Sequence, residues 1–390
     1  MDNKLFTPGP LNTKLSVKEA MLHDMGSRDK EFLEVVKEIR SELLILAGLS
    51  PEDGYDTVLM QGSGTFGVES VISTAIPIYG HLLILTNGAY GDRIKQMSRV
   101  YGIKTTTLKY KENIVPPVKD AEDILIKDET ITHVAIVHCE TTTGIFNDIE
   151  AIGALAKRFS KTYIVDAMSS FGAVPIDMKK LDIDFLISSS NKCIEGVPGF
   201  SFVIAKSKTL ETCIGQARTV SLDLYSQWID MKKSNQFRFT PPIQSILAFR
   251  QAIDELKAEG GIEKRAERYR NNYLRLIEGT EALGLKTYLD KKDQGYIITS
   301  FLFPENPNFD FTRFYESLHQ RGQVIYQGKL SDTNCFRIGN IGQLYLHDIE
   351  NLLTTIKEVM EDMGKNNSIP NINLATPHST NSKMTEVQFS

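Results

Sequence analysis

Six short apolar runs, separated by stretches with helical periodicity, recur along the chain between Thr57 and Ala205. The runs are Val58–Met60, Leu82–Leu85, Val134–Val137, Tyr163–Val165, Phe185–Ile187 and Phe202–Ile204. Because they show little alternation of apolar and polar residues, each run is typical of a strand buried on both faces. Such strands, separated by helices, predict an α/β domain whose mostly parallel sheet lies between layers of helices.

The sequence on either side of this alternation indicates where the domains lie. We expect an N-terminal segment at 1–25, a large α/β domain at 26–245 and a smaller α+β domain at 246–365. Charged residues of a predicted helix at about 262–284 are interpreted as a solvated face. Residues 366–390 are rich in Asn, Ser, Thr and Pro, so we expect them to form a disordered tail.

The composition argues against several classes of protein. Of the 390 residues, 41% are hydrophobic and 24% charged, with a net charge of −5, which is typical of a globular protein that binds no nucleic acid. No apolar run approaches the roughly 20 residues of a membrane span, and no secretion signal is recognisable, so we expect a cytoplasmic protein without membrane contact. The four cysteines lack metal-binding spacing, which predicts reduced thiols and no metal site.

Two chemically reactive residues follow two of the predicted strands. Lys192 lies just beyond Phe185–Ile187, and Asp166 ends the run Tyr163–Val165. Because the carboxyl ends of parallel strands meet at one edge of a sheet, we expect the amine and the carboxylate to face one cleft. Pyridoxal 5′-phosphate (PLP) needs this pair, since a lysine binds its aldehyde covalently and a carboxylate keeps its ring nitrogen protonated. The pair predicts a PLP-dependent enzyme.

Two turns at other strand ends are candidate cofactor contacts. In the turn that follows Val58–Met60, the first amides of the next helix and the hydroxyls of Ser63 and Thr65 could hold a phosphate. A tight turn without a ligand is the alternative, and it is the commoner structure. Tyr90 follows Leu82–Leu85 and could lie against the flat cofactor ring, or it could belong to the core.

Further polar groups lie near the same predicted sheet edge. Thr141 follows the run Val134–Val137 and could hydrogen-bond the hydroxyl of the cofactor ring. His138 is interpreted as a structural histidine, because it has no companions with metal-ligand spacing. Arg337 lies inside an apolar stretch, where an unpaired guanidinium would be costly. It therefore needs an anion, either the carboxylate or phosphonate of a substrate or, as the alternative, the acid of a structural salt bridge.

Taken together, these stretches resemble the class V aminotransferases, from Thr7 to about residue 363. The most specific segments are Gln61–Gly64, His138–Gly144, Val165–Gly172, Asn191–Phe200, Ser221–Tyr225 and Phe336–Gly342. The resemblance implies fold type I of the PLP-dependent transferases and an exchange of 2-aminoethylphosphonate and pyruvate for phosphonoacetaldehyde and L-alanine, a step of phosphonate catabolism. Alanine–glyoxylate or serine–pyruvate transamination is the alternative within the family. A PLP-free binding or regulatory protein is the alternative from another class.

The resemblance also implies roles for individual residues. Lys192 would bind the cofactor covalently and then move a proton, and Asp166 would hold the ring nitrogen. We expect cofactor contacts from Ser63, Gly64, Thr65, Tyr90, Thr141, Asp166, Asn191 and Lys192. In a homodimer, Thr240 would reach the phosphate bound by the other subunit. Arg337 would bind the substrates, with Arg238, Arg93 and Lys329 left open as auxiliary cations. The expected Tyr-Pro-Gly-Lys of the family is Tyr-Gln-Gly-Lys at 326–329 here.

Overall fold

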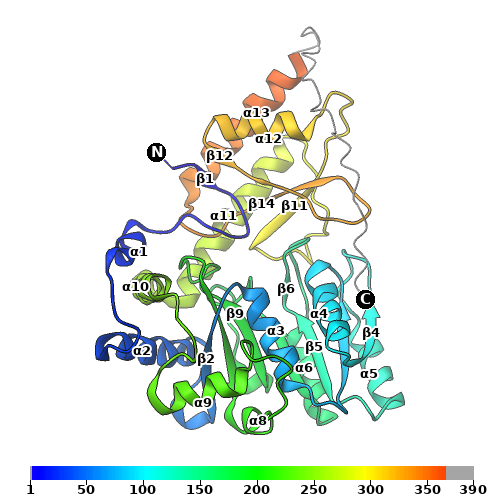
Figure 1. Cartoon of the computed structure of the whole chain (residues 1–390). Helices are drawn as coiled ribbons and strands as arrows, with labels where there is room; N and C mark the ends of the chain where they lie inside the picture. The colour runs from blue at the N-terminus through cyan, green and yellow to red at the C-terminus, as the bar shows by residue number, and fades with distance from the viewer. Residues whose placement is uncertain (1, 366–390) are drawn as a thin grey trace, which may run out of the picture.

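The computed structural model describes residues 2–365, so the tail expected at 366–390 lies outside the described residues (Figure 1). A seven-stranded sheet with the order β2-β10-β9-β8-β5-β3-β4 forms its centre. Its strands are β2 (Tyr55–Gln61), β3 (His81–Thr86), β4 (Lys104–Lys109), β5 (His133–Val137), β8 (Thr162–Asp166), β9 (Phe185–Ser189) and β10 (Phe200–Lys206). Only β10 runs antiparallel to its neighbours in this sheet. The prediction of a mostly parallel α/β sheet is therefore confirmed.

The degree of burial of each strand explains which strands could be predicted from the sequence. Every residue of β3, β5 and β9 is buried, and each of these strands contains an uninterrupted run of at least three apolar side chains. Strand β4, at the edge of the sheet, reads Lys-Thr-Thr-Thr-Leu-Lys and is only partly buried. It was missed because an edge strand needs no continuous apolar run.

Helices cover the sheet and continue into the second part of the molecule (Figure 1). They are α1 (Leu15–Glu19), α2 (Lys30–Leu46), α3 (Gly64–Ala75), α4 (Ala89–Val100), α5 (Val118–Lys127), α6 (Ile149–Arg158), α7 (Met178–Leu181), α8 (Ser207–Glu211), α9 (Leu224–Ser234), α10 (Ile243–Glu259), α11 (Gly261–Ala282), α12 (Phe311–Gln320) and α13 (Leu346–Lys365), with short 3₁₀ turns at Ala20–Leu22 and Pro51–Asp53. Helices α3 and α4 pack on strands of the central sheet. No helix in the described range is long and apolar enough to cross a membrane.

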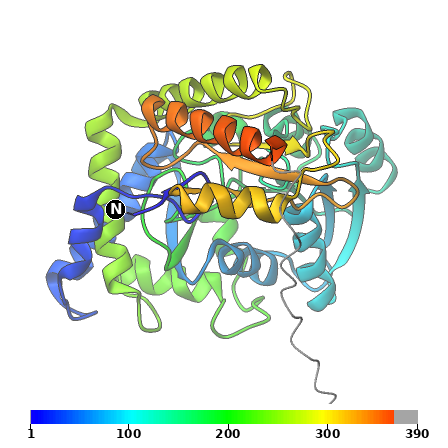
Figure 2. The ribbon, with the colours of Figure 1, turned by 90° about the horizontal axis from the view of Figure 1, so that it is seen from above.

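A smaller antiparallel sheet lies beside α11, α12 and α13, which Figure 2 shows from above. Its strands are β11 (Ile298–Leu302), β14 (Cys335–Gly339) and β13 (Tyr326–Gln327), in that order. The start of the chain joins this part, because β1 (Lys4–Leu5) pairs in parallel with β12 (Gln323–Val324). A short hairpin, β6 (Cys139–Glu140) and β7 (Ile145–Phe146), follows β5.

Two hydrophobic clusters correspond to these two parts of the molecule. The larger extends along the chain from Val17 to Ile253, and the smaller combines Phe6 with residues 276–363. Between them, α11 carries a charged segment that we interpreted as solvated. That interpretation is wrong for Arg265, which is fully buried, and for Arg268, which is 12% exposed. Both arginines form ion pairs with acidic side chains in the interior.

Candidate active site

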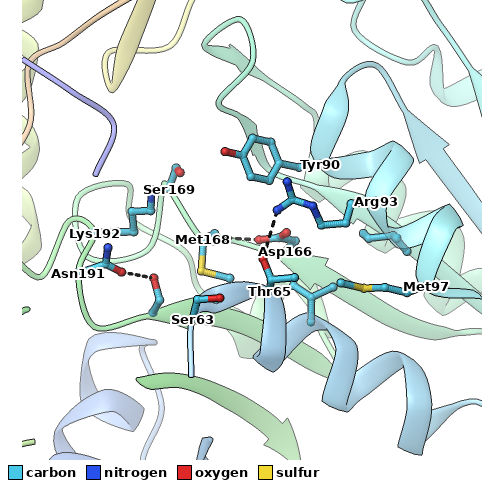
Figure 3. A pocket seen from close by; sticks show the side chains of 14 residues that line it. Ser63, Thr65, Tyr90, Arg93, Met97, Asp166, Met168, Ser169, Asn191 and Lys192 are labelled. Carbon is cyan, nitrogen blue, oxygen red and sulfur yellow. Dashed lines mark hydrogen bonds between the residues drawn. The ribbon is translucent and has the colours of Figure 1, made fainter. Parts of the chain in front are cut away.

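A cavity opens where β8 and β9 end and where α3 and α4 begin (Figure 3). It measures about 700 Å³ including its mouth. The lining residues are Ser63, Gly64, Thr65, Val68, Tyr90, Arg93, Ile94, Met97, Asp166, Met168, Ser169, Ser189, Asn191 and Lys192. The structure therefore brings seven of the ten predicted site residues into one cavity. Thr141, Thr240 and Arg337 lie outside its lining.

Lys192 lies in the loop that follows β9, and its amine donates a hydrogen bond to the carbonyl of Pro8 at 2.6 Å. Burial lowers the pKa of Lys192 to about 8, which the nearby carboxylate of Asp166 only partly opposes. Roughly a tenth of the amine is consequently uncharged at pH 7, far more than for an ordinary lysine. An uncharged amine is the form that can attack a carbonyl carbon and accept a proton.

Asp166 is the last residue of β8, and its side chain is buried. One carboxylate oxygen accepts a hydrogen bond of 2.9 Å from the Met168 amide. Burial raises the pKa of Asp166 to about 6, although that amide and the charge of Arg93 favour ionisation. Within residues 2–365 this carboxylate forms no salt bridge. It is therefore available to accept a hydrogen bond from a protonated ring nitrogen.

The start of α3 forms the candidate anion-binding turn. Gly62 has φ +101°, a left-handed conformation that glycine adopts without strain, and it directs the chain from β2 into the helix. The Ser63 hydroxyl makes no capping hydrogen bond, and the first amides of a helix have no intrahelical partners. Arg93 donates to the Thr65 hydroxyl at 3.1 Å, so a cation lies at the same turn. A Cβ atom on Gly64 would overlap the Met168 sulfur, so a larger residue there would require the Met168 side chain to move.

The first turns of α4 supply the aromatic side of the cavity. Tyr90 and Arg93 both project into it, opposite Lys192 and Asn191 (Figure 3). The Arg93 guanidinium lies over the Tyr90 ring, 4.9 Å from its centre. Of the three auxiliary cations left open by the sequence, Arg93 is the one that lines this cavity.

Arg337 lies in β14, and only 2% of its surface is exposed. Its guanidinium donates to the carbonyl of Thr141 at 2.9 Å and to that of Gln327 at 3.2 Å. No carboxylate of the described chain lies within salt-bridge distance, so the alternative of a structural ion pair finds no support here. Burial lowers the pKa of Arg337. The positive charge of Arg337 also adds to the effect of burial in lowering the pKa of Lys192.

Thr240 is exposed and belongs to the segment that precedes α10. This segment borders a separate depression lined by Ser27, Arg28 and residues 236–241. The Gln61 side chain donates to the carbonyl of Phe239 at 3.0 Å, which ties the segment to the end of β2. Thr240 thus lies beside the anion-binding turn without entering the cavity of its own chain.

Sequence reasoning missed several neighbours of the site. Pro8 was given no role, and its contact with Lys192 joins residues 184 positions apart. Met168 and Ser169 line the cavity through the turn after β8. Glu140 lies fully buried behind α4 and had been assigned no role. Within the described range, no group of three or more His, Cys, Asp or Glu side chains could hold a metal ion.

The residues present fit PLP group by group. The Lys192 amine is suited to its aldehyde, and the Asp166 carboxylate to its ring nitrogen. The Tyr90 ring offers a flat surface for the pyridine. The Ser63 and Thr65 hydroxyls, together with the positive end of α3, match a phosphate. The donor set therefore has the chemistry that this cofactor requires.

The model of the family described as Aminotransferase class-V matches residues 16–330, and the chain belongs to this family of PLP-dependent, fold type I enzymes. Among its curated relatives, the 2-aminoethylphosphonate–pyruvate transaminase of Salmonella agona is 49% identical over 358 residues, which cover 91% of this chain and 97% of the relative. The enzyme of the same name from Lysinibacillus sphaericus is 50% identical over 357 residues, covering 92% and 97%.

A solved structure places the fold in the same group. The alanine–glyoxylate aminotransferase of Nostoc sp. superposes with a TM-score of 0.84 at 25% identity, and the match covers 92% of this chain and 96% of that one. Its similarity extends over both parts of the molecule.

Proposed function

We propose that this chain is a PLP-dependent transaminase that converts 2-aminoethylphosphonate and pyruvate into phosphonoacetaldehyde and L-alanine. The observation that carries the proposal is the meeting of Lys192 and Asp166 in one cavity beside the positive end of α3. The choice of substrates is supported by relatives of that name, which are 49% and 50% identical to this chain over 91% and 92% of its length.

When bound, PLP supplies an electron sink for the negative charge that develops on the substrate carbon. Asp166 holds the proton on the ring nitrogen and so stabilises that charge. Lys192 Nζ would hold the cofactor and, as a free amine, would accept the proton that the substrate carbon bearing nitrogen gives up and later donate it again. The lowered pKa of Lys192, about 8, suits a group that must both accept and donate a proton near neutral pH.

Arg337 serves both substrates in turn. Its guanidinium fork fits a phosphonate as well as a carboxylate. Its partners in the described chain are backbone carbonyls, so no salt bridge has to break when a substrate binds. Arg93 already contacts the Thr65 hydroxyl, so we assign it to the phosphate side of the cofactor. Lys329 is exposed and lines a separate depression beside the start of α4, so it is not assigned to either substrate.

The active form in this proposal is a homodimer. Phe239, the residue before Thr240, and Phe66, in the first turn of α3, are both exposed, and exposed apolar side chains of this kind occur at interfaces. A second subunit covering it would bring its own Thr240 toward the phosphate end of the first cavity. Two-fold symmetry would then make both cavities equivalent.

An assay of amino donors tests the proposal. With PLP present, 2-aminoethylphosphonate should yield phosphonoacetaldehyde over repeated turnovers only when pyruvate is supplied, and Lys192→Ala should abolish the product. Failure of this reaction beside rapid alanine–glyoxylate or serine–pyruvate exchange would favour the alternative within the family. A colourless protein that binds no PLP would instead indicate a binding or regulatory role.

A further inference from the structure

The segment Glu140–Thr142 contacts both parts of the proposed site, although none of its residues lines the cavity. Its backbone carbonyls face the small antiparallel sheet. The carbonyl of Thr141 accepts from Arg337 at 2.9 Å, and the carbonyl of Thr142 accepts from the Ser300 hydroxyl at 3.2 Å. The segment therefore fixes the strand that presents the buried guanidinium.

The side chains of the same segment hold the start of α4. One oxygen of the Glu140 carboxylate accepts from the amides of Tyr90 at 3.2 Å and Gly91 at 3.3 Å. The other accepts from the Thr142 hydroxyl at 2.6 Å, and that hydroxyl accepts from the amide of Ala89 at 3.2 Å. Two side chains thus satisfy three successive amides of the first turn, which otherwise have no partner.

The helix has no capping side chain of its own, because its N-cap is Gly88. A Cβ atom at that position would overlap the Glu140 side chain, so the carboxylate packs directly against the helix start. Glu140 is fully buried and has no salt-bridge partner in the described chain. Burial raises its pKa to about 7, and the negative charge of Asp166 acts in the same direction. A buried carboxylate of this kind is more typical of a functional site than of a stabilising contact.

We propose that Glu140 is a positioning residue of the transaminase. It fixes the first turn of α4 so that Tyr90 and Arg93 face the cofactor, at a set separation from the Arg337 that the same segment holds. Glu140 touches neither cofactor nor substrate, and the inference rests on the proposed function. Loss of the Glu140 carboxylate should therefore change the separation between the Tyr90 ring and the Arg337 guanidinium.

The test compares Glu140→Gln with Asp148→Asn. Asp148 caps α6 with the same chemistry, accepting from the Ala151 amide at 2.9 Å, but lies outside the cavity lining. Glu140→Gln replaces one acceptor oxygen by an amide donor that faces other donors. We expect its affinity for PLP to fall about tenfold and its kcat/KM to fall roughly 10- to 100-fold, with KM raised for both substrates. The circular dichroism of bound PLP should change. Asp148→Asn should lower the melting temperature alone.

Several outcomes would overturn the inference. Glu140→Gln that folds and keeps the wild-type spectrum, PLP affinity and kcat/KM within about twofold would do so. If that variant does not fold, Gly88→Ala takes its place, because it keeps the carboxylate but displaces it. An unchanged cofactor spectrum in Gly88→Ala would then exclude the role. Wild-type protein that binds no PLP would instead remove the proposed function, and the inference with it.

Discussion

Burial moves the pKa values of Lys192 and Asp166 toward each other, to about 8 and about 6. The cause is the same for both, since a desolvated site disfavours an ammonium and a carboxylate alike. Neither group is neutralised by a salt bridge in the described chain. The folded protein therefore buries an amine and a carboxylate at a cost in free energy, and a bound cofactor would give each of them a partner.

Asp166→Asn should stabilise the cofactor-free protein while it removes activity. The raised pKa means that folding disfavours the charged carboxylate, so wild-type stability falls as pH rises from about 4 to 6 and stays lower above 6. Without that charge, the variant should gain about 2–3 kcal/mol at pH 8 and almost nothing at pH 4. Urea unfolding at both pH values measures the difference. A variant that is less stable at pH 8, or one that retains turnover, would contradict the assigned role.

Arg337→Lys should weaken the binding of both substrates. Lysine keeps the positive charge but loses the fork, and with it the paired contacts to the carbonyls of Thr141 and Gln327. We expect kcat/KM to fall about 100-fold for 2-aminoethylphosphonate and for pyruvate, with PLP affinity unchanged. Arg321→Lys, on the surface beside Asp362, is the matched control. A defect confined to one substrate would show that another cation binds the other anion.

At the scale of elements, α3 presents its unsatisfied amides and the free Ser63 hydroxyl to the cavity. Ser63→Ala should weaken PLP binding about five- to tenfold, which corresponds to the loss of one hydrogen bond to a charged group. Ser50→Ala is a suitable control, because Ser50 caps the short turn at Pro51–Asp53 away from the cavity. Equilibrium titration with PLP measures both. Equal affinities of the two variants for PLP would show that the cofactor phosphate does not bind at Ser63.

Helix α11 carries a buried ionic network. Arg268 pairs with Glu195 at 2.8 Å and with Glu259 at 2.7 Å, and Glu195 belongs to the loop of Lys192. Arg268→Met should lower the free energy of unfolding by about 3 kcal/mol, because the buried Glu195 then keeps, among ion pairs in the described chain, only the longer contact with Arg265, at 3.8 Å. Arg275→Met, on the same helix but paired with Glu350 at the surface, should cost less than about 1 kcal/mol. Equal losses in denaturant unfolding would show that the network contributes nothing beyond a surface pair.

This network also shows where sequence reasoning stops. Apolar runs predicted the buried strands correctly, because full burial on both faces leaves a local signal. The placement of Lys192 and Asp166 in one cavity followed from the rule that the carboxyl ends of parallel strands lie at one edge of the sheet. The burial of Arg268 depends on acids up to 73 residues away, and the contact of Arg337 with Thr141 spans 196 residues. Only the folded chain brings such partners together.

At the scale of the whole molecule, the first residues of the chain contact both the smaller part of the molecule and Lys192. Strand β1 pairs with β12, and the carbonyl of Pro8 then accepts from the Lys192 amine. The small antiparallel sheet presents Arg337 from the opposite part of the chain. Residues from the beginning, middle and end of the described chain thus lie in or beside the proposed active site.

The proposed dimer predicts a coupled loss of assembly and cofactor. Sedimentation of the wild type should give twice the 43.8 kDa of one chain. Phe239→Glu places a charge on the proposed interface, and it should shift the protein toward the monomer and weaken PLP binding at once. Ile78→Glu, at another exposed apolar position, controls for surface charge. A monomeric wild type with tight PLP binding would contradict the proposed contribution of Thr240.

The most direct measurement is a single half-reaction with the PLP-loaded protein. Mixed with 2-aminoethylphosphonate in the absence of pyruvate, the enzyme should release one equivalent of phosphonoacetaldehyde per active site and then stop. Added pyruvate should yield one equivalent of L-alanine and restore turnover. No phosphonoacetaldehyde, while alanine or serine converts the bound cofactor under the same conditions, would contradict the account.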